Sequence, residues 1–408
     1  MRPCRPCLWL VLCFSCILSA ADSLPEIESK AAALKAAGDA AGALAAYQEA
    51  ATLDPKSPRY QDEIGFLLAV LNRRTEALEY FQQAISLDAK FAPAHFHLGV
   101  ARWLQQETDR AITELQAAAD LEPENGAYQS KLGQALETSG RHPEAVPHLK
   151  AAVQLQPADA TAWNSLGSAL EKSGDAPAAV DAYSHAVEVA PANLDARNNL
   201  GLMLVKVRRA DEGIAEFQKV LAADPSNNTA RFNIGFAHLL KAELDQAIPV
   251  FRDVIARDPN HAAAHYNLGV ALKNKDDIDG AKAEFHRALE IDPKLSEAHY
   301  MLGITCWQSG EFEHASDEMR AAIALRPDYA EAYFMLGTVL KQKGESAPAE
   351  EALRTAIRLD PVNPGPYNTL ALILRQKGDV EGSKKMFAEG ARVKAAKETE
   401  LGIMLGRP

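Results

Sequence analysis

Small and apolar residues recur along this chain with a period of 34 residues. When the sequence is shifted against itself by 34 residues, nine glycines fall into one register without an insertion: Gly65, Gly99, Gly133, Gly167, Gly201, Gly235, Gly269, Gly303 and Gly337. A fixed period of this length is typical of repeat proteins, in which each repeat is one supersecondary element. The pattern therefore predicts an array of equivalent elements.

With this glycine at position 8, eleven repeats cover residues 24–57, 58–91, 92–125, 126–159, 160–193, 194–227, 228–261, 262–295, 296–329, 330–363 and 364–397. Residues 398–408 follow as a C-terminal tail. Ala31 and Ala371 replace the glycine in the first and last repeats. Such departures are expected at the ends of an array, because one face of a terminal repeat meets water.

The pattern within each repeat predicts two helices. Positions 4, 7, 8 and 11 have the spacing i, i+3, i+4 and i+7, which places them on one face of a first helix. Positions 20, 24 and 27 form the matching face of a second helix. Glycine at position 8 and alanine at position 20 let the two backbones approach, and phenylalanines at position 24 fill the remaining space: Phe81, Phe217, Phe251 and Phe285. We therefore predict an all-α fold of helical hairpins.

Glycine and proline mark the ends of these helices. Position 15 carries Gly38, Gly140, Gly174, Gly310, Gly344 and Gly378, where a left-handed cap would end the first helix. Position 32 carries Pro55, Pro123, Pro157, Pro191, Pro225, Pro259, Pro293, Pro327 and Pro361, which disfavour helical geometry in the preceding residue. Pro147 and Pro249 fall inside predicted second helices and should bend them locally.

The repeat that begins at residue 160 resembles the tetratricopeptide repeat family. It carries the family's signature at the family's spacing: Trp163, Leu166, Gly167, Leu170, Ala179, Tyr183, Ala186 and Pro191. The resemblance covers residues 24–397. It implies a right-handed superhelical solenoid of antiparallel hairpins, in which the first helices line a concave surface through positions 2, 5, 6, 9, 12 and 13.

The inward positions implied by this resemblance carry a series of asparagines. Asn199, Asn233 and Asn267 occupy position 6 of consecutive repeats, and Asn164 and Asn198 occupy position 5. The series is similar to the asparagine ladder in the repeats of protein O-GlcNAc transferases, which grips the backbone of extended polypeptides. A carboxamide suits this use because it offers both donors and acceptors to a peptide group. The alternative is that asparagine is only tolerated on a wetted helix face.

Aromatic residues interleave with these asparagines at other inward positions. The candidates for contact with a partner are Phe232, Tyr266 and Tyr300 at position 5, Phe236 at position 9 and Trp307 at position 12. An exposed apolar stripe indicates a binding surface. The same residues could instead pack between neighbouring repeats, because periodicity does not say which side of an interface a residue faces.

Residues 1–21 are expected to be a signal peptide. Arg2 and Arg5 precede an apolar run from Cys7 to Leu18, and small residues follow up to Ala21. We expect this leader to export the chain, either to a periplasm or out of the cell, and to be cleaved after Ala21. Lipidation at Cys16 and an uncleaved anchor remain as alternatives. Removal of this leader would leave Cys306 as the only cysteine, so no internal disulfide is expected.

Charge and motif content limit the remaining functions. The formal net charge is −12, which makes nucleic acid an unfavourable partner. His261 and His265 are four residues apart but have no evident third ligand, so no metal site is expected. Cys306 lies at an apolar position and is interpreted as a buried hydrophobic residue. No phosphate-binding loop, nucleophile motif or carboxylate pair stands out, and no catalytic residue or cofactor is predicted.

The sequence thus predicts an exported, non-enzymatic scaffold or adaptor that binds an extended polypeptide or a protein partner in its concave groove. Two alternatives remain open. The array could recruit substrates for a separately encoded transferase or hydrolase, or it could be a lipidated component of an envelope assembly or secretion machine. Its oligomeric state is not predicted.

Overall fold

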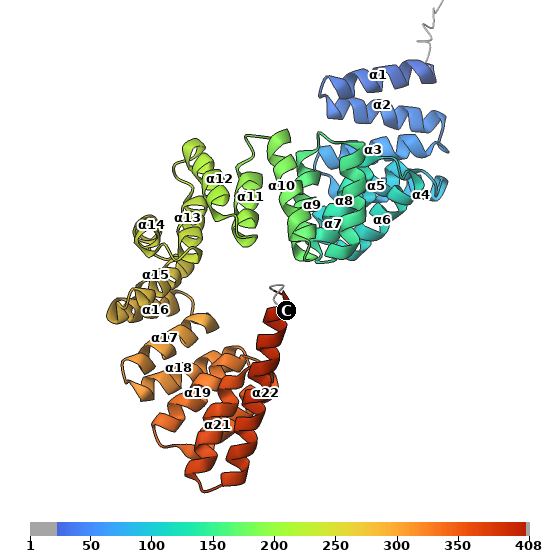
Figure 1. The fold of residues 1–408 in the computed structure, drawn as a ribbon. Helices are drawn as coiled ribbons and strands as arrows, with labels where there is room; N and C mark the ends of the chain where they lie inside the picture. Colours follow the sequence, from blue (N-terminus) through green and yellow to red (C-terminus); the bar gives the residue numbers. More distant parts are fainter. Residues whose placement is uncertain (1–22, 405–408) are drawn as a thin grey trace, which may run out of the picture. The chain divides into compact units, whose positions relative to one another are not determined.

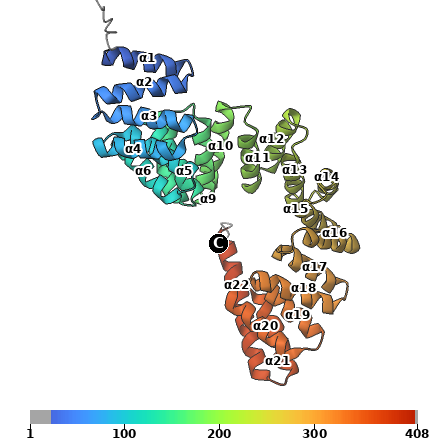
Figure 2. The same ribbon diagram turned by 180° about the vertical axis from the view of Figure 1, so that it is seen from behind.

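The computed structural model describes residues 23–404, with side chains for residues 23–399. Within this range the chain forms twenty-two α-helices and no β-strand (Figures 1 and 2). The prediction of an all-α solenoid of helical hairpins is confirmed. The predicted leader, residues 1–21, lies outside the described residues, as do residues 405–408 of the predicted tail.

The helices group into two compact units, Met1–Ala190 and Pro191–Pro408, which we call the N-terminal and C-terminal units and describe separately. The N-terminal unit contains α1 (Leu24–Ala36), α2 (Ala40–Leu53), α3 (Pro58–Val70), α4 (Arg74–Leu87), α5 (Ala92–Leu104), α6 (Thr108–Leu121), α7 (Gly126–Thr138), α8 (His142–Leu155), α9 (Ala160–Lys172) and α10 (Ala176–Val189). The C-terminal unit contains α11 (Leu194–Lys206), α12 (Ala210–Ala223), α13 (Asn228–Leu240), α14 (Leu244–Arg257), α15 (Ala262–Asn274), α16 (Ile278–Ile291), α17 (Ser296–Gln308), α18 (Phe312–Leu325), α19 (Ala330–Gln342), α20 (Ser346–Leu359), α21 (Pro364–Gln376) and α22 (Val380–Met404).

Each odd-numbered helix begins on the first residue of a repeat, and each even-numbered helix begins on position 17. Short polar side chains explain many of these starts. Asn125 and Asp159, for example, accept hydrogen bonds from the first free backbone amides of α7 and α9. Asp39, Asp175 and Asp277 cap α2, α10 and α16 in the same way. Such caps satisfy amides that have no partner inside the helix.

The turn between the two helices of every repeat uses one left-handed residue. All six predicted glycines have positive φ, between 77° and 88°. The other five repeats reach the same conformation at position 15 without glycine: Asn72, Gln106, Arg208, Ala242 and Asp276, with φ between 58° and 66°. The hairpin geometry therefore imposes this conformation even on residues that disfavour it.

Ala242 is the residue least suited to this conformation, since it has no polar side chain to compensate. We expect Ala242→Gly to raise the free energy of unfolding by about 0.5–1 kcal/mol, because glycine removes the Cβ conflict. Urea denaturation followed by circular dichroism would measure the change. Gly344→Ala is the matched reverse substitution and should destabilise by about 1 kcal/mol. If both variants match the wild type, the left-handed turn does not limit stability.

The core of each hairpin follows the predicted small-residue pattern. The alanines at position 20 are fully buried: Ala77, Ala111, Ala145, Ala179, Ala247, Ala281, Ala315 and Ala349. A Cβ placed on Gly201 would lie 2.5 Å from the ring of Phe217, and one on Gly269 would lie 2.7 Å from Phe285. The glycines are therefore required by close contact with the second helix, as predicted.

Two features of the second helices extend beyond the repeat pattern. The helices α8 and α14 continue through Pro147 and Pro249, so neither proline ends its helix. The last helix, α22, spans 25 residues and runs from Val380 to Met404. The first part of the predicted tail, residues 398–404, is thus a continuation of this helix.

Polar side chains at position 4 connect several hairpins to the loop before them. In His95, Arg197, His265 and His299, one nitrogen pairs with a glutamate on the second helix at 2.6–2.7 Å. Another nitrogen of each side chain lies 3.0–3.3 Å from the carbonyl oxygen six residues earlier. These three-way contacts tie the start of the first helix to the preceding loop and to the second helix.

The contact at His299 should make stability depend on pH. The hydrogen bond to Glu318 raises the pKa of His299 above its ordinary value of 6.5, and only the protonated ring can donate from both nitrogens. The resulting stabilisation is fully present below pH 6.5 and is lost as pH rises through the folded-state pKa. We expect His299→Gln to reduce this pH dependence of the free energy of unfolding, measured by urea denaturation across the same pH range. His286→Gln, at an exposed histidine of the same unit, should leave the pH profile unchanged.

Candidate functional site

The predicted asparagine series spans both units. Asn164 lies on α9 in the N-terminal unit, whereas Asn199, Asn233 and Asn267 lie on α11, α13 and α15 in the C-terminal unit. Asn233 and Asn267 are only 4% and 9% exposed. The Asn267 amide donates a hydrogen bond of 2.8 Å to the Ala263 carbonyl in its own helix. The series is therefore partly embedded in the packing between repeats.

Two buried amide atoms of this series have no hydrogen-bond partner among the described residues: Oδ1 of Asn198 and Nδ2 of Asn233. One is an acceptor and the other a donor. They occupy positions 5 and 6 of consecutive repeats, the same two positions at which Asp62 and His97 pair at 2.8 Å in the N-terminal unit. Buried polar atoms without a partner are costly and uncommon, which marks this pair as a place where polar contacts are still to be made.

The predicted aromatic residues are all partly buried in the C-terminal unit. The Phe232 ring lies 5.8 Å from Phe251 and 5.0 Å from His261, measured between ring centroids. Tyr266 packs on a core phenylalanine, and Phe236 and Trp307 contact the same core cluster. Tyr300 packs on Tyr329. Burial raises the pKa of Tyr266 and of Tyr300 to about 12, so both phenols stay neutral.

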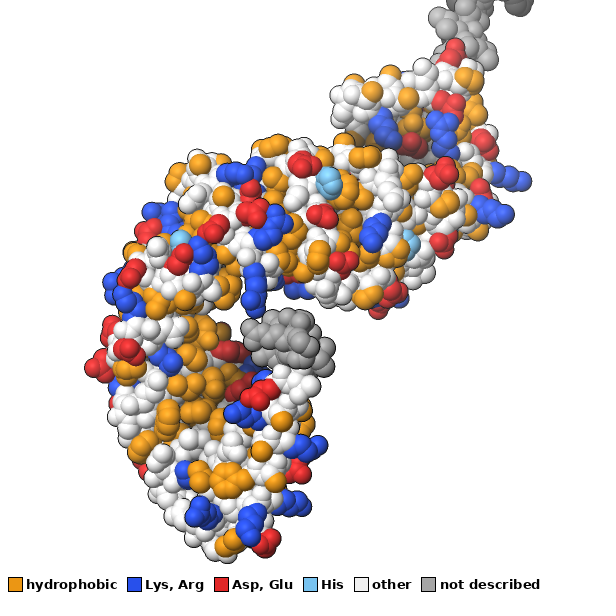
Figure 3. Space-filling view, in the orientation of Figure 1, with side chains coloured by type: hydrophobic (Ala, Val, Ile, Leu, Met, Phe, Trp, Pro, Cys, Tyr) orange, Lys and Arg blue, Asp and Glu red, His pale blue; other side chains and the backbone are white. Residues whose placement is uncertain are grey.

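These residues combine a packing role with a surface role. Each keeps part of its side chain accessible. Tyr300 and Trp307 lie on α17, and Figure 3 shows hydrophobic side chains gathered over α17 and α19 of the C-terminal unit. The two interpretations left open by the sequence are therefore compatible. One part of each ring stabilises the repeats, while the remainder forms an apolar surface on the first helices.

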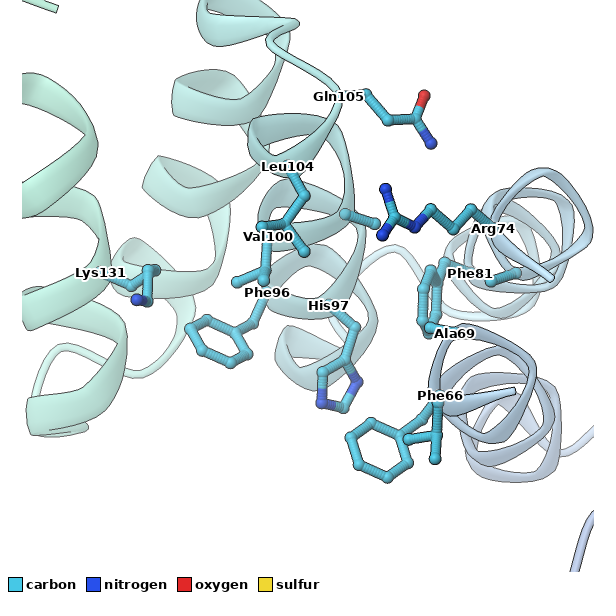
Figure 4. Close-up of a pocket in the computed structure, with 13 residues that line it drawn as sticks. Phe66, Ala69, Arg74, Phe81, Phe96, His97, Val100, Leu104, Gln105 and Lys131 are labelled. Carbon is cyan, nitrogen blue, oxygen red and sulfur yellow. The ribbon is translucent and has the colours of Figure 1, made fainter. Parts of the chain in front are cut away.

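A second surface, not singled out by the sequence analysis, lies in the N-terminal unit (Figure 4). It is a cavity of about 410 Å³ between α3, α4, α5 and α7. Its lining consists of Phe66, Ala69, Val70, Arg74, Ala77, Phe81, Phe96, His97, Val100, Ala101, Leu104, Gln105 and Lys131. We call it the apolar cavity, because most of these side chains are hydrophobic.

Small residues explain why the apolar cavity is open. Ala69 on α3 and Ala101 on α5 line it, and the buried Ala77 and Phe81 of α4 lie beneath them. Ala69 is at position 12 of its repeat, and no other repeat has alanine there. Trp103 and Trp307, for example, occupy this position in two other repeats.

The rim of the apolar cavity is unusually exposed. Val70 and Leu104 line it and are 58% and 68% exposed. Exposed apolar side chains that line a concave pocket are typical of a binding site.

The side chains of the apolar cavity that can carry a charge are all of the basic types. Its lining contains Arg74, Lys131 and His97 but no aspartate or glutamate. The Lys131 ammonium lies 5.0 Å from the centre of the Trp103 ring and 3.1 Å from Oε1 of Gln134. His97 packs among Phe66, Phe81 and Phe96, with ring centroids 5.4–5.7 Å apart.

Comparison with known protein families agrees with this architecture. A tetratricopeptide repeat model matches residues 65–126, 102–160, 130–193, 164–228, 198–252 and 300–364, which together make up more than half of the chain. A second tetratricopeptide repeat model matches residues 238–303. The chain belongs to the tetratricopeptide repeat family. Arrays of this family typically act as non-catalytic protein-interaction scaffolds.

A solved structure of another tetratricopeptide repeat protein resembles this chain in fold, and two further solved structures align with lower scores. A tetratricopeptide repeat protein from Parabacteroides merdae aligns with a TM-score of 0.53 at 16% identity, over 61% of this chain and 98% of that one. Yeast Tom70 aligns with a TM-score of 0.49 at 15% identity, over 94% of both chains. MamA is 28% identical over 41% of this chain and 97% of its own, with a TM-score of 0.39. No curated protein matches the sequence.

The sequence contained a signal for the apolar cavity that periodicity alone did not isolate. Positions 12 and 13 are inward positions of the tetratricopeptide repeat, and Ala69, Val70 and Leu104 occupy them in adjacent repeats. A small residue next to two apolar ones at these positions leaves both space and exposed apolar surface. Positions 12 and 13 carry this pattern only when they are considered together across adjacent repeats.

Other candidate chemistry in the array has a structural explanation. Cys306 is buried as predicted, and burial raises the pKa of its thiol to about 11, so it is not a thiolate at neutral pH. Across residues 23–399, no group of three or more histidine, cysteine, aspartate or glutamate side chains is placed to hold a metal ion. None of the described helices is both long and apolar enough to cross a membrane.

Proposed function

We propose that this tetratricopeptide repeat protein is an exported scaffold that binds an extended polypeptide, or an extended segment of a protein partner, along its first helices. The observation that carries the proposal is the concentration of partly exposed apolar residues on these helices. They form the apolar cavity on α3 and α5 and the apolar surface over α17 and α19. A folded chain keeps such residues accessible mainly where they contact a partner.

The asparagine series supports an extended partner. A peptide backbone in extended conformation offers an N–H donor and a carbonyl acceptor at every residue. The acceptor of Asn198 and the donor of Asn233 both lack a partner in the described residues. A small opening of this region on binding would let a peptide group satisfy both atoms at once.

Triple replacement of Asn199, Asn233 and Asn267 by alanine tests this proposal. We expect the variant to retain its helicity, since alanine is a strong helix former, but to capture its partner about tenfold less well, because several polar contacts are lost together. The measurement is cross-linked affinity capture from the native compartment, compared with wild type.

The control variant carries alanine at Asn260, an exposed asparagine of the same unit that lies at position 33 of its repeat, outside the first helix. It should capture the partner like wild type. Undiminished capture by the triple variant would remove the asparagine series from the binding surface. Reduced capture together with a lower melting temperature would show a structural role instead.

Export is the second part of the proposal, and it rests on the features of residues 1–21. Cleavage after Ala21 would give a mature chain that begins with the free amine of Asp22. Mass spectrometry of the mature N-terminus tests this directly. Acylation at Cys16 would place the protein on a membrane surface instead, and an intact leader would contradict cleavage.

A further inference from the structure

The volume of the apolar cavity and the charged residues in its lining indicate what kind of partner it binds. Its volume of about 410 Å³ lies within the range of roughly 300–1,000 Å³ that is typical of ligand pockets. Because the floor formed by Ala77 and Phe81 is already buried, the space is suited to a single bulky apolar group that enters past Val70 and Leu104.

The two cations of the cavity lie on opposite sides of its apolar residues. Figure 4 shows Lys131 on one side of Phe96, Val100 and Leu104, and Arg74 on the other side. Within the described part of the chain, neither cation forms an ion pair with a carboxylate. The whole chain has a net charge of −12, so a lining with cations and no acid is a local departure from its overall charge.

We propose that the apolar cavity binds an internal segment of an extended polypeptide in which a bulky apolar residue is flanked by acidic residues. The apolar side chain occupies the space above Phe81, and carboxylates on either side pair with Arg74 and Lys131. This inference rests on the proposed scaffold function and specifies the chemistry of the bound segment.

The arrangement of charge selects this occupant over others. Two cations on opposite sides match an internal segment better than a terminal carboxylate, which places its charge at one end only. A second copy of the chain is disfavoured, because two molecules with a net charge of −12 repel each other. The apolar contact is expected to set the lifetime of the complex, and the two cations are expected to set the association rate and the salt dependence.

Fluorescence anisotropy with the full-length protein tests this assignment. The probe is a short labelled peptide, amidated at its C-terminus, with one phenylalanine between two pairs of aspartates. Two comparison peptides replace the phenylalanine by alanine or the aspartates by lysines. We expect each replacement to weaken binding by at least about tenfold, because each removes one of the two matched contacts.

Variants of the cavity assign the binding to its residues. Leu104→Asp places a carboxylate on the rim and should weaken binding at least about tenfold, because apolar burial is lost and charge is repelled. Leu240→Asp is the matched control, since Leu240 has the same repeat position and is 58% exposed in the other unit. It should bind like wild type. Ala69→Trp should fill the cavity, and the fold is expected to accept it because Trp103 and Trp307 occupy the same repeat position.

The contribution of the two cations to peptide binding is tested by Arg74→Gln combined with Lys131→Gln. We expect about three- to tenfold weaker binding at low salt and a smaller difference at high salt, since surface charges are screened. Lys90→Gln combined with Arg110→Gln is the control, because both side chains are exposed in the same unit and lie outside the lining.

The outcomes separate this inference from the proposed function. Equal binding of the aspartate and lysine peptides would show that the bound segment needs no acidic residues. Unchanged binding of the aspartate peptide to Leu104→Asp and Ala69→Trp would show that its apolar residue does not occupy the apolar cavity. Either result would overturn the inference. If these two variants lose the peptide but still capture the native partner, the cavity site stands and the partner is held elsewhere. If capture of the native partner fails in wild type while the peptide binds, the scaffold proposal fails and the cavity site remains. Concentration-dependent dimerisation that is abolished by Leu104→Asp would identify a second copy as the occupant and overturn the inference.

Discussion

Replacing Phe217 by alanine is expected to lower the free energy of unfolding of the C-terminal unit by about 3–5 kcal/mol, the usual cost of removing a buried aromatic side chain. Phe217 on α12 is fully buried, and its ring lies against Gly201 on α11. Gly201 has no side chain that could fill the space that the ring leaves. The cavity should therefore persist, which places the loss near the upper end of this range.

Urea denaturation of the full-length protein measures this change, and hydrogen exchange read by mass spectrometry locates it. In a repeat array, stability is a sum over repeats and their interfaces, so the increase in exchange should centre on α11 to α13. Phe387→Ala is the control, since this phenylalanine of α22 is exposed, and it should cost no more than about 1 kcal/mol. A loss of less than about 1 kcal/mol in Phe217→Ala would mean that the hairpin interface relaxes around the gap.

The repeat pattern of the sequence was sufficient to predict the helices, because several independent signals agree within each repeat. Gly174, for example, ends α9 in the left-handed conformation, and Pro191 follows the residue that ends α10. Arg208 and Ala242 show the limit of this reasoning. They adopt the same left-handed turn without any local preference for it, so their conformation follows from the pairing of the helices. It could be predicted only from their position in the repeat, which they share with the six glycines.

Contacts between repeats were harder to predict, because they depend on residues far apart in the sequence. The structure shows that His299 joins Glu318 to the carbonyl of Pro293. Such a contact needs three separate segments to meet, which a periodic pattern does not specify. The length of α22 likewise exceeds what the repeat pattern predicts.

The candidate site could be predicted only in part. The sequence placed Asn233 and Tyr266 on first helices, but it could not determine how deeply they are buried between neighbouring repeats. The apolar cavity depends on Ala69 and Ala101, which are 32 residues apart and occupy different repeat positions. Each alanine is unremarkable alone. Space appears only when two adjacent helices both carry a small residue at their contact.

Gly201→Val is expected to destabilise the C-terminal unit by about 3 kcal/mol, at the upper end of the usual cost of overpacking. A Cβ on this residue would lie 2.5 Å from Phe217, and the ring is fully buried, so it has no free space to enter. Valine gains only about 0.5 kcal/mol in helix propensity over glycine, which does not offset the clash.

Combining Gly201→Val with Phe217→Ala distinguishes a steric clash from any other effect of the valine. In the double variant the valine methyl groups occupy the space left by the ring, so the two losses should not add. We expect the double variant to be no less stable than Phe217→Ala alone, which corresponds to a coupling of at least about 3 kcal/mol in a double-mutant cycle. Additive losses would instead show that valine acts on the helix backbone. Close contact with Phe217 would then not be the reason for glycine at position 8.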